Sequence, residues 1–153
     1  RRAAPTTPPP SPTPTVTRTP SAAPSARARK PARPQPGEPV PFERLRVGEC
    51  FDVDRDAPGT PTRLPCDSPH DAEAVARLRL VGLFLTDDEV RHRAAELCRA
   101  PLRVKAAAQP AGTYWTTYVQ YPYRNAYLLG SDTIVCSLAT LTDSGRKLHA
   151  PLQ

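Results

Sequence analysis

The sequence contains no run of 18 apolar residues and no recognisable signal peptide. A membrane-spanning helix needs about 20 consecutive apolar residues, so no segment of the given chain is predicted to cross a bilayer. The chain begins at Arg1 rather than at a methionine, and we expect a membrane anchor upstream of Arg1.

Residues 42–153 also lack a net charge, because they contain 14 basic and 14 acidic side chains. Domains that bind nucleic acid normally have a basic patch of their own, so nucleic acid is not an expected partner. The formal net charge of +6 belongs instead to residues 1–41, which have seven basic residues and a single acid, Glu38.

What the chain has in excess is proline, and thirteen of its 21 prolines fall in residues 1–41. Alanine, serine and threonine fill most of the rest of this segment. Such a composition cannot bury enough apolar surface to offset the entropy lost on folding. We therefore predict a disordered linker over residues 1–41 and one folded domain over residues 42–153.

Four cysteines occur in the predicted domain: Cys50, Cys66, Cys98 and Cys136. An even number in a small domain behind a proline-rich linker indicates two disulfides and an oxidising compartment. Three pairings are open, and we favour Cys50 with Cys66 and Cys98 with Cys136. Two alternatives are a zinc site built on Cys66 and His70, and a reduced cytosolic protein. Zinc sites normally bring two close ligand pairs, and only one exists here.

The order of predicted elements is β-β-β-α-β-β, an α+β domain with a mostly antiparallel sheet and one main helix. The third strand alternates, with Ala72, Ala74, Ala76, Leu78 and Leu80 on one face. The last residues could add an edge strand. The predicted strands span residues 45–53, 63–66, 71–81, 114–121 and 133–141.

The main helix has a clear start signal. Thr86 followed by Glu89 three residues later forms a capping box. Val90, Ala94, Leu97 and Cys98 then recur at helical spacing and predict the buried face. Proline removes a backbone donor and clashes with the preceding turn, so we predict that the helix ends by Pro101, with helical character resuming near residues 106–108.

Several short strings resemble the septum formation domain of actinobacterial envelope proteins. They are Val47-Gly48-Glu49-Cys50-Phe51, Pro65-Cys66, Pro69-His70-Asp71-Ala72-Glu73, Tyr121-Pro122 and Val135-Cys136. The family usually has tryptophan at the position of Tyr127, and an acid–arginine pair where this chain has Asp132-Thr133. The resemblance covers about residues 45–152. It implies an extracytoplasmic domain behind one transmembrane helix and a linker, with no defining catalytic chemistry.

Exposed aromatic side chains suit binding to proteins or glycans, and this chain has a dense tyrosine cluster after residue 113. Residues 115, 117, 119 and 121 are expected on one face of their strand, and residues 114, 116 and 118 on the other. The candidate binding surface consists of His70, Glu73, Tyr114, Trp115, Tyr118 and Tyr127. We identify no catalytic residues, metal ligands or cofactor site, because His70 and Asp71 point to opposite faces of a strand.

The sequence therefore predicts a non-catalytic cell-envelope module, held outside the cytoplasm by a membrane anchor or by association with the cell wall. Its expected partner is a component of the cell wall, or an envelope, division or signalling protein. The alternative is the extracytoplasmic ligand-sensing domain of a membrane receptor or kinase. An aromatic patch favours the first function, and a small-ligand pocket favours the second.

Overall fold

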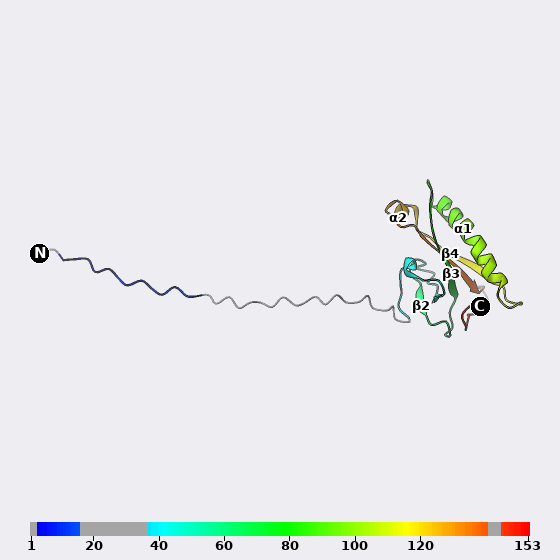
Figure 1. The fold of residues 1–153 in the computed structure, drawn as a ribbon, viewed down its shortest axis with the longest axis horizontal. Coiled ribbons are helices and arrows are strands. Elements are labelled where there is room, and N and C mark those ends of the chain that lie inside the picture. The colour runs from blue at the N-terminus through cyan, green and yellow to red at the C-terminus, as the bar shows by residue number, and fades with distance from the viewer. Residues whose placement is uncertain (1–2, 16–36, 141–144) are drawn as a thin grey trace. The chain divides into compact units, whose positions relative to one another are not determined.

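The structure is a computed structural model that describes residues 3–15, 37–140 and 145–153 (Figure 1). The chain divides into residues 1–32 and residues 33–153. Residues 3–15 are exposed and contain no helix or strand. The prediction of disorder for residues 16–36 lies outside the described residues. The second unit is the α+β domain that the sequence predicts.

A five-stranded antiparallel sheet forms the centre of the domain, with strand order β2-β1-β3-β5-β4. The predicted strands are all present, although most are shorter than predicted. Residue 141, the predicted end of the last strand, lies outside the described residues. In place of a further edge strand, Leu148 forms a single bridge to His70. The strands are β1 (Cys50–Asp52), β2 (Thr62–Leu64), β3 (Ala72–Arg79), β4 (Trp115–Gln120) and β5 (Thr133–Thr140).

The helix α1 (Asp87–Ala107) covers one face of the sheet (Figure 1). Its capping box is formed as predicted, since the Thr86 side chain accepts from the Glu89 backbone N–H and the Glu89 carboxylate accepts from the Thr86 backbone N–H. Val90, Ala94 and Cys98 are fully buried against β5 and β3. A core therefore lies between α1 and this face.

The prediction that the helix ends by Pro101 is wrong, because α1 continues for six more residues. Leu102 extends the buried row one turn past Cys98 and is only 2 % exposed. An interior proline costs about 3 kcal/mol relative to alanine. Burying a leucine side chain recovers roughly 1.5–3 kcal/mol of that cost. The burial of apolar side chains along α1 therefore outweighs the helix-breaking effect of Pro101.

The opposite face of the sheet is covered by the segment that precedes β1. The short 3-10 helix η1 (Phe42–Arg44) and its neighbours bury Val40, Phe42 and Leu45 against Phe51 and Val135. We call residues 37–42 the N-terminal strap. The strap runs beside residues 59–63, and the backbone N–H groups of residues 37, 40 and 42 donate to the carbonyls of residues 63, 61 and 59. The predicted boundary after residue 41 thus falls inside an ordered segment.

The predicted alternation along β3 holds only in part, because a register shift between Ala74 and Ala76 breaks it. Ala72 and Ala74 pack in the cluster beneath η1, whereas Ala76 and Leu78 pack in the α1 core. A β-bulge inserts one extra residue, so every side chain beyond it changes face. The sequence gives no warning here, since alanine suits either face.

Both disulfides form with the predicted pairing. Cys50–Cys66 has a Cα–Cα distance of 5.2 Å and joins β1 to the turn after β2. Cys98–Cys136 has a Cα–Cα distance of 5.4 Å and joins α1 to β5. Cys98 and Cys136 are both fully buried, so this cross-link lies inside the core. None of the described helices is long and apolar enough to span a bilayer.

Candidate functional site

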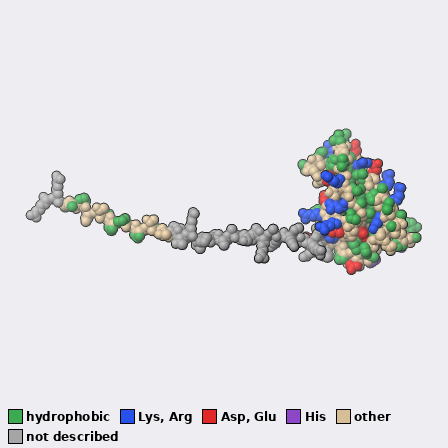
Figure 2. Space-filling model, in the orientation of Figure 1, with side chains coloured by type: hydrophobic (Ala, Val, Ile, Leu, Met, Phe, Trp, Pro, Cys, Tyr) green, Lys and Arg blue, Asp and Glu red, His purple; other side chains and the backbone are tan. Residues whose placement is uncertain are grey.

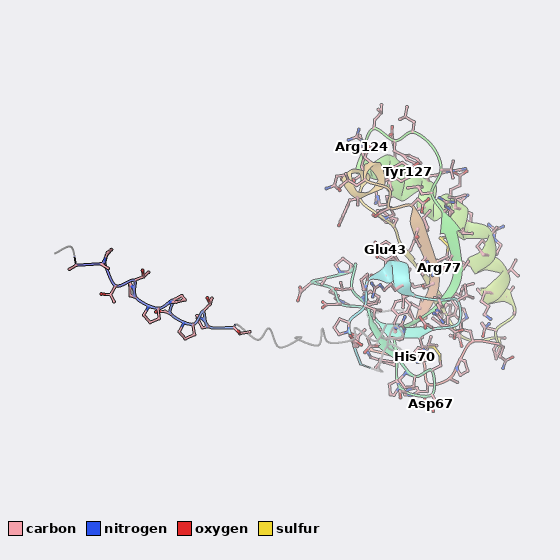
Figure 3. The ribbon with its side chains drawn as sticks, turned by 60° about the vertical axis from the view of Figure 1, so that its left-hand side comes forward. Glu43, Asp67, His70, Arg77, Arg124 and Tyr127 are labelled. Atoms are coloured by element: carbon pink, nitrogen blue, oxygen red, sulfur yellow. A yellow bond between two sulfur atoms is a disulfide. The ribbon has the colours of Figure 1, made fainter. Side chains whose placement is uncertain are left out.

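A groove opens on the face of the molecule that η1 covers. Its floor is the end of β4, and its walls are η1, the turn of residues 58–60, and the start of the short helix α2 (Arg124–Leu128). The volume is about 490 Å³. We call it the tyrosine groove, because Tyr118, Tyr121 and Tyr123 line it. In Figure 3, Glu43 marks its η1 side and Arg124 marks its α2 side.

Gln120 is the buried polar residue of this groove. It is 5 % exposed, and its Nε2 donates to the Pro58 carbonyl oxygen at 3.2 Å. Its Oε1 is buried and has no hydrogen-bond partner among the described residues. Leaving a buried polar atom unpaired costs about 1–3 kcal/mol. Oε1 itself is closed off from solvent, so a ligand in the groove can donate to it only when neighbouring side chains shift.

The tyrosines of the groove differ in their surroundings. Burial raises the pKa of Tyr118, whose ring also contacts Phe51 at a centroid distance of 6.3 Å. Burial is also the main cause that raises the pKa of Tyr121. Tyr123 is 62 % exposed. The groove therefore has a half-buried floor and an open aromatic wall, and the raised pKa values keep the phenols of Tyr118 and Tyr121 neutral at ordinary pH.

The α2 wall is fixed by bonds to the loop between β3 and α1 and to the first residue of α1. The Tyr127 hydroxyl donates to the Gly82 carbonyl at 2.8 Å, and its ring packs edge-on against Phe84 at 5.3 Å. Arg124 donates through its backbone N–H to Asp87 Oδ1 at 2.6 Å and through Nε to the Phe84 carbonyl at 2.9 Å. This helix was not predicted. Gly130, which has a positive φ directly after its C-cap, is the stop signal that could have indicated it.

His70 and Glu73 were predicted to lie on a binding surface, and the structure places both in the interior. Their exposed fractions are 0 % and 4 %. His70 Nδ1 hydrogen-bonds the Ser68 carbonyl at 2.7 Å, and Glu73 Oε2 accepts from the Leu152 backbone N–H at 2.6 Å. These residues hold neighbouring backbone segments together and cannot contact a partner directly.

The C-terminal residues are also held by Lys147, whose Nζ lies 2.8 Å from Asp52 Oδ1 and 3.1 Å from Asp71 Oδ1. Partial burial disfavours the ammonium group, but the hydrogen bonds to the two carboxylates outweigh this effect and raise the pKa of Lys147. Residues 145–153 are thus fastened to β1 and β3 by a lysine, a buried histidine and a buried glutamate.

The predicted aromatic residues do not form one surface either. Trp115 packs against the core beneath α1, and Tyr118 packs in the cluster on the other face of the sheet. This separation confirms the predicted alternation along β4. Tyr127 serves as a structural clamp, and Tyr114 is 78 % exposed at the start of β4. Of the six predicted residues, only Tyr118 lines the tyrosine groove.

The zinc alternative loses its ligands in this structure. Potential ligand atoms of Cys50, Cys66 and Glu73 lie within 4.8 Å of one another, but both sulfur atoms belong to the same disulfide. A metal-bound cysteine must be a thiolate. Cys66 therefore cannot pair with His70 to hold zinc while the disulfide is intact.

A second hollow runs along α1 beside Leu83 and Leu85, with a volume of about 650 Å³. Its charged groups are largely engaged, since Glu89 completes the capping box and Arg93 pairs with Glu96 at 2.8 Å. Hydrophobic side chains gather at this end of the domain, over the β3–α1 loop and α2 (Figure 2). The exposed members are Val81, Leu83, Leu85, Leu128 and Leu129.

Comparison with protein-family models, with curated proteins and with solved structures finds no significant match to this chain.

Proposed function

We propose that this chain is a non-catalytic extracytoplasmic recognition module, which binds an envelope partner in the tyrosine groove. The two disulfides support the compartment, because such bonds persist mainly in oxidising environments. The resemblance of its cysteine motifs to septum formation domains leads to the same expectation. The partner would be a wall component or an envelope protein involved in division or signalling.

The observation that carries the proposal is the unpaired Gln120 Oε1 in a groove walled by tyrosines. Small-ligand and peptide sites are typically concave and mostly apolar, with a few polar groups that set the orientation of the ligand. Tyrosine offers a large contact area with little loss of side-chain entropy on binding. The groove combines both features on a rigid sheet.

The lining of the groove supports binding rather than catalysis. Among the described residues that line it there is no cysteine, serine or histidine, and Glu43 is the single ionisable group apart from the tyrosines. Acid–base or nucleophilic catalysis needs a reactive group held by at least one positioned partner. The ligand-sensing alternative keeps one point in its favour, because about 490 Å³ is also a suitable volume for a small molecule.

The experiment is cosedimentation of the purified, oxidised full chain with isolated bacterial cell envelopes. Wild-type protein should sediment with the envelopes, and Gln120→Leu and Tyr123→Ala should reduce the bound fraction. Gln109→Leu is the matched control, since Gln109 bonds Gln153 and does not line the groove. Equal sedimentation of wild-type and both groove variants would refute the proposal. Tyr123 is exposed, so its truncation should leave the fold intact.

A further inference from the structure

The tyrosine groove is negatively charged. In the part of the chain that the structure describes, Glu43 is the single charged residue of the lining, which has no arginine, lysine or histidine. Arg77 lies near Glu43 in Figure 3, but its guanidinium donates to the Glu43 backbone carbonyl at 2.7 Å. The described residues provide no ion-pair or hydrogen-bond partner for the Glu43 carboxylate. The groove thus presents a free anion beside an aromatic wall.

The uncharged groups of the groove also favour a ligand with positive charge and hydrogen-bond donors. Gln120 Oε1 is a carbonyl oxygen and can only accept a hydrogen bond, and the Nε2 bond to the Pro58 carbonyl fixes the orientation of the amide. Tyrosine faces carry negative electrostatic potential and attract cations that lie over them. Carboxylate, amide oxygen and aromatic face all favour a ligand that carries positive charge and several hydrogen-bond donors.

We infer that the groove binds an arginine or lysine side chain presented by an extended, proline-containing peptide of a partner protein. This inference rests on the proposed function and names the ligand class of the same site. A guanidinium has five N–H donors and no acceptor, and its plane stacks on aromatic rings. Its charge, its donors and its planar shape therefore suit the carboxylate, the amide oxygen and the aromatic rings of the groove.

An extended peptide suits the walls of the groove. Pro41, Pro58 and Pro122 line the groove together with the tyrosines, and β4 at its floor is an edge strand of the sheet. Aromatic-lined grooves bind proline-containing segments in the polyproline II conformation, which is already extended before binding. Anionic ligands such as phosphates would meet the Glu43 carboxylate, and no cation is among the described residues that line the groove. A neutral glycan could bond Gln120 but would leave that carboxylate unpaired.

The test uses a synthetic peptide with one arginine between two prolines, and a matched peptide with glutamine in place of the arginine. Residues 27–34 of this chain are themselves rich in arginine and proline. The titration is therefore run on a full chain whose basic residues in that segment are glutamine. The side-chain amide signals of Gln120 and the ring signals of the tyrosines report binding by NMR. A neutral chitin tetramer is the third probe.

The arginine peptide should bind at least about tenfold more tightly than the glutamine peptide, as expected for one charge-assisted hydrogen bond. Glu43→Gln should weaken arginine-peptide binding about tenfold. Glu38→Gln should leave it unchanged, because Glu38 is an exposed carboxylate on the strap outside the groove. Higher salt should weaken wild-type binding and have less effect on Glu43→Gln.

Equal affinity for the two peptides, or an unchanged affinity in Glu43→Gln, would overturn the inference. Binding of the chitin tetramer alone, with shifts at Gln120, would also overturn it and would identify the groove as a glycan site. In both cases the proposed function is judged separately by the envelope cosedimentation, so the two failures are distinguishable.

Discussion

The disulfide between Cys98 and Cys136 closes a loop of 38 residues, and its removal should cost more than removal of the other cross-link. In the chain-entropy model, the 38-residue loop contributes about 3.9 kcal/mol at 25 °C. The 16-residue loop between Cys50 and Cys66 contributes about 3.1 kcal/mol in the same model. Burial increases the difference, because both sulfur atoms of this pair leave a cavity in the core, whereas only Cys50 of the other pair is fully buried.

Urea unfolding of two double variants measures this difference. With an m value of about 1.5 kcal/mol/M, Cys98→Ala/Cys136→Ala should lower the unfolding midpoint by about 2.6 M. Cys50→Ala/Cys66→Ala should lower it by about 2.1 M under the same conditions. Both variants must show a single transition before the comparison is made.

Partial reduction of the wild-type protein gives an independent check of the same reasoning. Cys66 is half-buried, whereas Cys98 and Cys136 are fully buried. A mild thiol should therefore expose Cys50 and Cys66 to alkylation first, and the buried pair should react only when the domain unfolds. A larger loss of stability in Cys50→Ala/Cys66→Ala, or earlier labelling of Cys98, would refute the argument.

Three further predictions concern single residues. Pro101→Ala should raise the free energy of unfolding by about 2 kcal/mol, as measured by urea unfolding. The substitution restores a backbone donor in the helix, and the entropy that the unfolded chain gains offsets part of this effect. An unchanged or lower unfolding midpoint would show that Pro101 does not destabilise α1. Tyr127→Phe should cost about 1 kcal/mol and speed amide exchange in residues 81–85, because the bond to Gly82 is lost; unaltered exchange would show that the bond does not fix this loop. Folding raises the pKa of Lys147. Its contribution to stability should therefore be complete below about pH 10, and it should vanish as the pH rises through the pKa of Lys147 in the folded state. Comparing wild-type with Lys147→Met by urea unfolding at several pH values tests this, and a difference that grows with pH would have the wrong sign.

The start of α1 and the order of elements along the chain follow from local signals in the sequence, whereas the favoured cysteine pairing is one of three that the sequence leaves open. A capping box at Thr86 specifies the helix start through two hydrogen bonds within four residues. The end of the same helix could not be predicted this way. Pro101 is a local signal, and it is overridden by the burial of Leu102 against strands distant in sequence.

The candidate site also depends on contacts between residues that are distant in sequence, which local patterns do not predict. Glu73 lies in a strand with alternating polarity, and the pattern places it among solvent-facing residues. Its position is decided by the bulge after Ala74 and by the backbone N–H of Leu152, and neither can be inferred from the residues near Glu73. Gln120 was missed for a related reason. A single glutamine at the end of a strand is unremarkable until η1 and the turn at Pro58 bury it.

The N-terminal strap determines how the domain would respond to mechanical load. A pull on Gly37 breaks the bonds between the strap and residues 59–63 one after another, as in a zipper, rather than all together. Peeling stops at Cys50, after about 40 Å of released chain, because the disulfide then carries the load directly to Cys66. Phe42 and Glu43 line the tyrosine groove, so they leave it during this extension. Tension on the N-terminal side would therefore dismantle the groove while the rest of the sheet remains folded, and a ligand in the groove would resist the pull.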